Sequence, residues 1–323
     1  MIEQIYNFAK SRNLEIGITT AEPFLELRES LINEDLKGFV EQDIQKRIYP
    51  TLTMKNAKSI LVLAMPYQYR KKQERQELTG EFSIAAVGTD YHVLLKKHLE
   101  ALAQLLQQSI SNFEYQSFVD TGPLIDRALA VRAGLGWIGK NHCLHTQKFG
   151  SLVFIGYMMT NIALEEKKRI IGDCGSCNYC RVACPTGALS EKFEIKKCIS
   201  YLTQTKTVLP TEVMKTMGKQ LYGCDVCQIV CPKNQKVLQS LEEKNTSFSL
   251  EELLYCSNKD FMDKIGKTAA GWRGKKILQR NAIIALGNSK NEKALPLLQN
   301  ALQDKRELIQ QTALKAIYNF NNF

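Results

Sequence analysis

The chain's most chemically informative residues are its cysteines. It has 323 residues and ten cysteines, eight of which fall between positions 174 and 231. The first group reads C-x2-C-x2-C-x3-C-P from Cys174, and the second reads C-x2-C-x3-C-P from Cys224. The first spacing is that of bacterial ferredoxins, in which four thiolates hold each 4Fe–4S cluster and the fourth cysteine of a run crosses to the other cluster. Cys198 lies between the groups and completes the eight thiolates that two such clusters require.

This crossover predicts a ligand set for each cluster. One cluster is expected on Cys174, Cys177, Cys180 and Cys231, and the other on Cys184, Cys198, Cys224 and Cys227. Clusters of this kind relay single electrons. The remaining two cysteines, Cys143 and Cys256, are interpreted as ordinary half-buried thiols.

Zinc and disulfides are the alternative uses of such cysteines. A zinc site usually joins two C-x2-C pairs, and three cysteines at that spacing followed by x3-C-P overfill its tetrahedron. Disulfides need an oxidising compartment. Residues 1–10 lack the charged and then apolar pattern of a secretory signal, so disulfides are less favoured than clusters.

Other candidate residues lie upstream of the cysteines. Asp120 ends a strand-like run before Thr-Gly-Pro, and it is a candidate acid, although turns and helix caps are the commoner use of such a residue. Gly134, Gly136 and Gly139 fit G-x-G-x-x-G, but the run follows a helical segment and lacks the later acidic residue of a dinucleotide site. We interpret it as a glycine turn that approaches another backbone or a ligand closely. The four histidines lack metal-site spacing and are interpreted as structural or surface residues.

The elements that position these residues follow from hydrophobic periodicity and breakers. Helices are predicted over 2–12, 21–39, 90–110 and 124–133, and strands over 14–20, 59–65, 115–119, 142–146 and 151–160. Charged or polar loops are predicted over 70–80 and 203–210. The pattern predicts an α+β protein with an N-terminal α/β domain (1–165), a ferredoxin-like domain (166–245) and a helical segment (246–323).

The helical segment carries most of the excess positive charge. Residues 264–323 contain 11 Lys and Arg against 3 Asp and Glu, in a chain whose net charge is +10. Such a segment favours a polyanion such as nucleic acid, with a solvated surface as the alternative. Residues 278–288 match residues 309–319, which is typical of HEAT-like helices. Two such helices cannot bury a core alone, so we expect them to dock on the preceding domain.

Several longer motifs make the chain resemble the epoxyqueuosine reductase family. They are VDTGP at 119–123, RAGLGWIGKN at 132–141, CGSCxxCxxACPTGAL at 174–189, CISYLT at 198–203, LYGCDVCQIVCP at 221–232 and RNAIIALGN at 280–288. The resemblance spans almost the whole chain. It implies a reductive-dehalogenase-like N-terminal domain that binds cobalamin, which two 4Fe–4S clusters supply with electrons. It implies that the enzyme reduces epoxyqueuosine to queuosine at the tRNA wobble position, the last step of queuosine biosynthesis.

The resemblance also implies roles for single residues, with Asp120 as the proton donor. The residues expected around cobalamin are Arg47, Ser83, Asp120, Leu144, Ile155, Ser200 and Asp225. Those expected to contact tRNA are Lys206, Lys275, Lys276 and Arg280. The segment 83–92 departs from the family, because it lacks the usual arginine and aromatic residue before G-x-D-Y-H.

The implied partners are tRNAs with GUN anticodons (Tyr, His, Asp and Asn) and an external low-potential reductant. No apolar run approaches the roughly 18 residues of a membrane helix, so a cytoplasmic monomer without membrane contact is expected. Two other functions use the same clusters. A reductive dehalogenase would act on a small molecule and has no use for the basic segment, and a ferredoxin-like carrier would have no substrate site.

Overall fold

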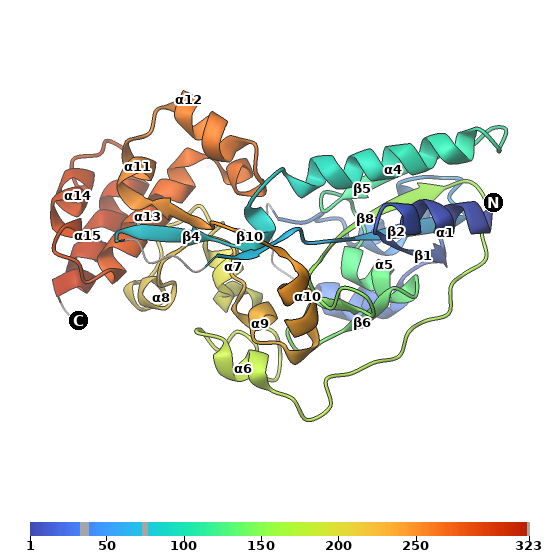
Figure 1. Cartoon of the computed structure of the whole chain (residues 1–323), viewed down its shortest axis with the longest axis horizontal. Coiled ribbons are helices and arrows are strands. Elements are labelled where there is room, and N and C mark those ends of the chain that lie inside the picture. The colour runs from blue at the N-terminus through green and yellow to red at the C-terminus, as the bar shows by residue number, and fades with distance from the viewer. Residues whose placement is uncertain (33–38, 73–76, 322–323) are drawn as a thin grey trace. The chain divides into compact units, whose positions relative to one another are not determined.

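Two compact units make up the chain (Figure 1). The computed structural model describes residues 1–32, 39–72 and 77–321. The first unit comprises residues 1–67 and 91–177, and the second comprises residues 68–90 and 178–323. The segment 68–90 therefore belongs with the cysteine-rich and helical parts, and the three predicted domains stay a prediction. No helix in the described ranges is long and apolar enough to cross a membrane.

The first unit is built on a four-stranded antiparallel sheet in the order β1-β2-β8-β5. Its elements are α1 (Ile2–Ser11), β1 (Glu15–Thr20), η1 (Leu25–Leu27), α2 (Arg28–Ile32), α3 (Ile44–Ile48), η2 (Pro50–Leu52), β2 (Ser59–Pro66), α4 (Tyr91–Gln107), β5 (Tyr115–Val119), α5 (Asp126–Arg132), β6 (Gly136–Ile138), β7 (Leu144–Thr146) and β8 (Val153–Thr160).

Helices cover both faces of this sheet, with α1 and α4 on one side and α5 on the other (Figure 1). Alternate residues of a strand point to opposite faces. Leu61 and Leu63 of β2 therefore join Leu99 of α4 in one core, while Val62 joins Leu129 of α5 in the other. The antiparallel pairing between two helical layers confirms the predicted α+β class.

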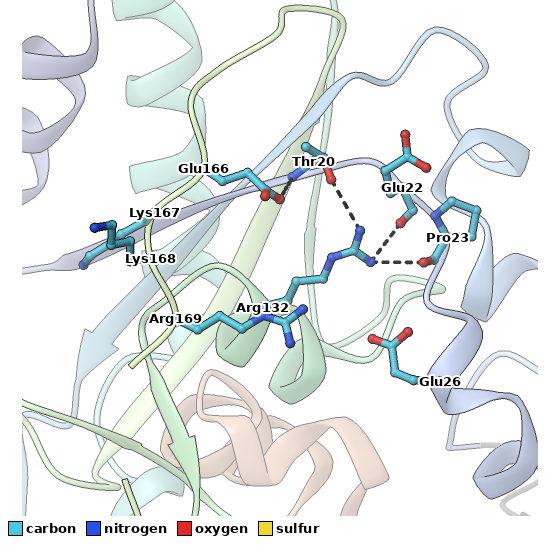
Figure 2. A pocket seen from close by; sticks show the side chains of 9 residues that line it. All are labelled: Thr20, Glu22, Pro23, Glu26, Arg132, Glu166, Lys167, Lys168 and Arg169. Atoms are coloured by element: carbon cyan, nitrogen blue, oxygen red, sulfur yellow. Dashed lines mark hydrogen bonds between the residues drawn. The ribbon is translucent and has the colours of Figure 1, made fainter. Parts of the chain in front are cut away.

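One predicted helix of the first unit is wrong over its described part. The helix expected over 21–39 is replaced by an irregular segment, the short η1 and an α2 of five residues, and residues 33–38 lie outside the described ranges. Arg132 donates hydrogen bonds to the carbonyl oxygens of Glu22 (2.9 Å) and Pro23 (3.2 Å) (Figure 2). A helix that began near residue 21 would use these two carbonyl oxygens as acceptors for its own backbone N–H groups. Here they accept hydrogen bonds from Arg132 instead.

The second unit contains small sheets and many short helices. Its elements are β3 (Tyr69–Lys71), β4 (Thr79–Phe82), η3 (Ile84–Ala86), α6 (Tyr179–Ala183), η4 (Ile195–Lys197), α7 (Ile199–Leu202), α8 (Thr211–Thr216), β9 (Gln220–Tyr222), α9 (Val226–Ile229), η5 (Pro232–Asn234), α10 (Gln235–Ser240), β10 (Glu242–Lys244), β11 (Ser247–Ser249), α11 (Leu250–Tyr255), α12 (Asn258–Phe261), η6 (Met262–Gly266), η7 (Ala269–Arg273), α13 (Lys275–Asn288), α14 (Ala294–Ala301) and α15 (Glu307–Asn321).

The loop predicted over 70–80 is only partly correct. Strand β3 pairs with β10, and β4 lies between β11 and β9, while residues 73–76 lie outside the described ranges. Strands of three or four residues are too short to show the alternation that identifies a strand in a sequence.

The two repeated helices pack against each other, as the sequence predicts. Ala282 and Ala285 of α13 and Ala313 and Ala316 of α15 are all buried, and a β-carbon at Gly287 would lie 2.9 Å from that of Ala316. Helix α13 also contacts β9 and α8. This contact confirms the expectation that the pair docks on the part of the chain that precedes it.

Candidate functional site

Asp120 lies in a strained loop directly after β5. Its φ is +53°, a left-handed conformation that few residues other than glycine adopt and that often marks functional positions. Its Oδ2 accepts a hydrogen bond from the Tyr91 hydroxyl and lies 3.5 Å from Nε2 of His92, both from the first turn of α4. The Asp120 side chain is 46% exposed, so a substrate can reach it. The sequence analysis interpreted His92 as a structural or surface residue, although the run Asp90-Tyr91-His92 at the start of the predicted helix could have revealed it.

A second carboxyl group lies close to Asp120. Asp126 begins α5, and its Oδ1 is buried without a hydrogen-bond partner among the described residues. Burial raises the pKa of Asp126 well above its ordinary value, and the neighbouring Asp120 charge raises it further, with Arg127 opposing the rise. Burial, and then the charge of Asp126, raise the pKa of the Tyr157 phenol.

The glycine run over residues 134–139 leads into Lys140, which contacts the loop that begins at Cys174. A β-carbon at Gly136 would lie 2.0 Å from the carbonyl oxygen of His145, so the run approaches another backbone, as predicted. The next residue, Lys140, donates its backbone N–H to Sγ of Cys174 at 3.3 Å. Its Nζ donates to the carbonyl oxygens of Gly175 (2.8 Å) and Cys177 (2.9 Å). Lys140 therefore fixes the loop that carries two predicted cluster ligands.

Three thiols of the other predicted cluster gather in the second unit. Burial raises the pKa of Cys224 to about 12, and the charges of Asp225, Cys198 and Cys184 add to the rise. The pKa of Cys184 is lowered: burial opposes ionisation, but the N–H and hydroxyl of Thr186 and two further backbone N–H groups bond to the sulfur. Helix α6 packs against α9, bringing the two cysteine runs together.

These surroundings fit thiolates that bind iron–sulfur clusters. Hydrogen bonds to cluster sulfurs are among the means by which proteins set the reduction potential of such clusters. Within the described ranges, no three His, Cys, Asp or Glu side chains lie close enough to share one metal ion. A cubane needs no such convergence, because each of its irons takes a different thiolate.

The residues predicted around cobalamin are divided between the two units. Arg47, Asp120, Leu144 and Ile155 belong to the first unit, and Ser83, Ser200 and Asp225 belong to the second. The structure brings Ser83 and Asp225 together, since Oδ1 of Asp225 accepts the Ser83 hydroxyl and its Oδ2 accepts the Ile84 N–H at 2.8 Å. Burial raises the pKa of Asp225 to about 6 against these bonds. Leu144 and Ile155 share the apolar core on the α5 side of the sheet.

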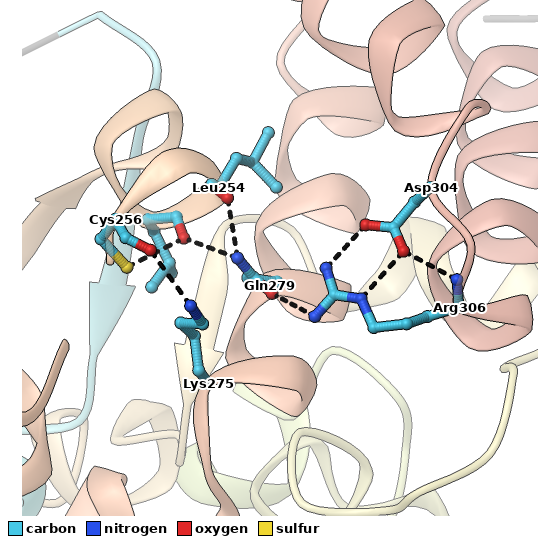
Figure 3. Close-up of polar contacts among 7 residues, drawn as sticks. Leu254, Cys256, Lys275, Gln279, Asp304 and Arg306 are labelled. Atoms are coloured by element: carbon cyan, nitrogen blue, oxygen red, sulfur yellow. Dashed lines mark hydrogen bonds and ion pairs between the residues drawn. The ribbon is translucent and has the colours of Figure 1, made fainter. Parts of the chain in front are cut away.

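The residues predicted to contact tRNA differ in exposure. Lys206 and Lys276 are exposed. Lys275 is half-buried, and its Nζ donates to the carbonyl oxygen of Cys256 at 3.1 Å (Figure 3). These three lysines remain predicted tRNA contacts.

Comparison with known proteins assigns the family. The family model described as "Epoxyqueuosine reductase QueG, DUF1730" matches residues 47–121, that of the 4Fe-4S double cluster binding domain matches residues 173–234, and that of HEAT repeats matches residues 273–322. Epoxyqueuosine reductase from Bacillus anthracis is 40% identical over 98% of this chain and 88% of that protein. The chain belongs to the epoxyqueuosine reductase family.

Solved structures of epoxyqueuosine reductases share the fold. One was determined with an epoxyqueuosine-modified tRNA-Tyr stem loop, and it has a TM-score of 0.92 and 41% identity over 99% of this chain and 90% of that one. Another, from Bacillus subtilis, has a catalytic loop with an aspartate swung out of the active site. It has a TM-score of 0.92 and 40% identity over the same shares of the two chains.

One predicted tRNA contact of this epoxyqueuosine reductase family member is wrong. Arg280 is fully buried, and its guanidinium donates to the carbonyl oxygens of Leu202 (2.9 Å) and Thr207 (3.1 Å) and to the Thr205 hydroxyl (3.3 Å). A side chain without exposed surface cannot reach a phosphate. Burial lowers the pKa of Arg280 to about 10. Its role is to fix the loop that contains Lys206.

The neighbouring Asn281 reinforces this attachment. Its Nδ2 donates to the carbonyl oxygens of Thr203 (2.8 Å) and Leu221 (2.7 Å), and the Thr203 hydroxyl accepts the Gly223 N–H at 3.0 Å. Helix α13 therefore fixes both chain segments that carry Cys198 and Cys224. Sequence reasoning recognised this motif as a family feature but not as a buried connection.

A separate open pocket of about 760 Å³ lies in the first unit (Figure 2). It is lined by Thr20, Glu22, Pro23, Glu26, Arg132, Glu166, Lys167, Lys168 and Arg169. None of the residues predicted for the active site of this family member lines it.

Proposed function

We propose that the chain reduces epoxyqueuosine to queuosine at the wobble position of tRNA. The observation that carries this proposal is full-length relatedness: 40% identity extends over 98% of the chain. The tRNA stem loop bound to a relative supports the choice of substrate. The basic helical segment also favours this substrate over the small molecule of a dehalogenase, and the constellation around Asp120 favours an enzyme over an electron carrier.

Asp120 acts in this proposal as the acid that protonates the epoxide oxygen. Its half-exposed side chain is accessible, and Tyr91 and His92 hold the carboxylate from α4. Proton transfer by such a residue typically accelerates a reaction by about 10²- to 10⁴-fold. The swung-out aspartate loop of the Bacillus subtilis relative supports a loop that moves as substrate enters and product leaves.

Two kinds of cofactor supply the electrons. The 4Fe–4S clusters would be held by the two predicted cysteine sets, with Lys140 and the N–H groups around Cys184 stabilising the thiolates. Cobalamin, when bound, would deliver low-potential electrons to the epoxide carbon. Leu144 and Ile155 would offer it apolar contact, and Arg47, Ser83, Ser200 and the Ser83-bonded Asp225 would offer polar contact.

The partners in this proposal are tRNAs with GUN anticodons and an external low-potential reductant. Lys206, Lys275 and Lys276 would contact the tRNA backbone, whose phosphates attract such lysines. The chain would work as a cytoplasmic monomer.

A tRNA panel tests the proposal. The four GUN tRNAs carrying epoxyqueuosine and one tRNA without that base are incubated with protein reconstituted with iron, sulfide and cobalamin, and binding and conversion are measured. We expect all four modified tRNAs to be converted, and equal binding of the unmodified control would count against recognition of the modified base. A chlorinated phenol serves as the rival substrate, and its dehalogenation would favour the dehalogenase function instead.

A further inference from the structure

The strongest unexplained feature of the first unit is the carboxyl group of Asp126, whose Oδ1 is enclosed although the residue as a whole is half-buried. It begins α5, beside the loop that carries Asp120, and its Oδ1 has no hydrogen-bond partner within the described part of the chain. Enclosing a carboxylate oxygen without a hydrogen-bond donor is costly in free energy, and this cost favours the protonated form of the group.

The surroundings of Asp126 favour its protonated form. The like charge of the neighbouring Asp120 carboxyl group raises the pKa of Asp126 further, and helix α5, which Asp126 begins, packs against β8, which carries Tyr157. The positive groups that face the pair are Arg127 and His92, and their charge opposes the rise in the pKa of Asp126 without overcoming burial. Two adjacent carboxyl groups cannot both ionise freely, so such a pair holds one proton between them.

The two carboxyl groups differ in their access to solvent. Asp120 is 46% exposed and contacts Tyr91 and His92, whereas Oδ1 of Asp126 is closed off from water. The Tyr157 hydroxyl accepts the Leu124 N–H at 3.3 Å, and a β-carbon at Gly122 would lie 2.1 Å from the same oxygen. The loop after Asp120 therefore rests on Tyr157, which keeps Asp120 next to Asp126.

The proposed reaction needs protons at this place. Conversion of an epoxide to an alkene breaks two C–O bonds and consumes two electrons and two protons, and the oxygen leaves as water. The first proton goes to the oxygen when the ring opens, and the second goes to the resulting hydroxyl when it leaves. The clusters and their external reductant supply the electrons, so the chain itself must deliver the protons through Asp120.

We propose that Asp126 is the proton reservoir behind Asp120, so that the two carboxyl groups act as one proton-holding pair. As Asp120 protonates the epoxide oxygen, it takes the proton that Asp126 holds. The second proton and the one that reloads Asp126 enter from solvent through the exposed side of Asp120. This inference rests on the proposed role of Asp120 as the acid and extends it by one residue.

Infrared spectroscopy tests the pair without turnover. In the reconstituted holoenzyme at pH 7, we expect a protonated-carboxyl band that shifts when aspartate is labelled with carbon-13. The band should be absent in Asp126→Asn and present in Glu165→Gln, which makes the same change at an exposed acid of the same unit. Absence of a labelled band in the wild-type protein would overturn the proposal, whether or not any variant folds.

Kinetics then separates this proposal from the proposed function. Asp126→Asn should lower the single-turnover rate by about 10²-fold. The wild-type rate should fall as rising pH deprotonates the carboxyl pair, and this dependence should be absent in Asp126→Asn. The variant's tRNA affinity and cluster content should not change. Asp126→Glu should recover part of the rate. An unchanged rate and pH profile in Asp126→Asn, together with loss of turnover in Asp120→Asn, would refute only the reservoir. Full activity of Asp120→Asn would refute the acid itself.

Discussion

Replacement of Arg280 by methionine should release the loop that contains Lys206. The guanidinium is fully buried and makes three hydrogen bonds to residues 202–207, at 2.9, 3.1 and 3.3 Å. Methionine keeps most of the aliphatic volume but provides no donor. The Thr207 carbonyl group would lose this partner and would regain one by opening to water, whereas the Leu202 carbonyl group would keep its bond from the Thr205 hydroxyl at 2.9 Å.

The size of the effect follows from these bonds. A hydrogen bond from a charged donor contributes about 1.5–3 kcal/mol, so the two carbonyl bonds give roughly 3–6 kcal/mol. Removing a guanidinium whose burial is itself costly offsets part of this loss, as its lowered pKa indicates. We expect a net decrease of about 3 kcal/mol in the local free energy of opening. This decrease corresponds to exchange of loop amides that is faster by on the order of 100-fold.

Native-state hydrogen exchange measures this opening directly. Amides of residues 202–207 should exchange faster in Arg280→Met, whereas the core amides of β2 should not change. Lys276→Met is the matched control, because it changes an exposed residue of the same helix. Unchanged protection of residues 202–207 in Arg280→Met would refute the assignment of Arg280 as the residue that fixes this loop.

Five further variants test separate parts of the molecule. Asp120→Asn should retain both clusters and tRNA binding but lose turnover by about 10²- to 10⁴-fold, and normal turnover would contradict its role as the acid. Lys206→Gln and Lys276→Gln should each reduce the slope of log affinity against log salt by about 0.7, which a salt titration of tRNA binding checks; an unchanged slope would remove that lysine from the interface. Lys140→Met should accelerate iron release to a chelator by about 10-fold, because it removes two bonds to the Cys174 loop, and unchanged release would argue against this role. Cys198→Ala should lower iron content by about half, and full iron content would contradict its assignment as a ligand.

The sequence predicted the four strands of the central sheet and the iron–sulfur chemistry of the cysteines. The runs over 59–65 and 151–160 became β2 and β8, because long and strongly apolar strands carry a clear pattern, and the run over 115–119 became β5. The C-x2-C-x2-C spacing could be recognised without tertiary information, because three neighbouring thiolates of one run bind the same cluster.

Other features depend on tertiary contacts that a single sequence hides. Arginine is usually exposed, so the sequence predicts a surface position for Arg280. Only its bonds to carbonyl groups of a loop distant in the sequence explain its burial. His92 showed no metal-site spacing, and its closeness to Asp120 arises only when α4 packs beside β5. Asp126 belongs to no motif that the sequence analysis singled out, and only the structure shows that its Oδ1 is enclosed.

The most direct test of the central claim is nucleoside mass spectrometry of treated tRNA. Protein reconstituted with iron, sulfide and cobalamin is mixed with a reductant and tRNA-Tyr that carries epoxyqueuosine, and the tRNA is digested to nucleosides. We predict conversion of epoxyqueuosine to a product lighter by one oxygen atom and identical to queuosine, with no conversion by Asp120→Asn. Unchanged epoxyqueuosine, from wild-type protein shown to contain both clusters and bound cobalamin, would contradict the account.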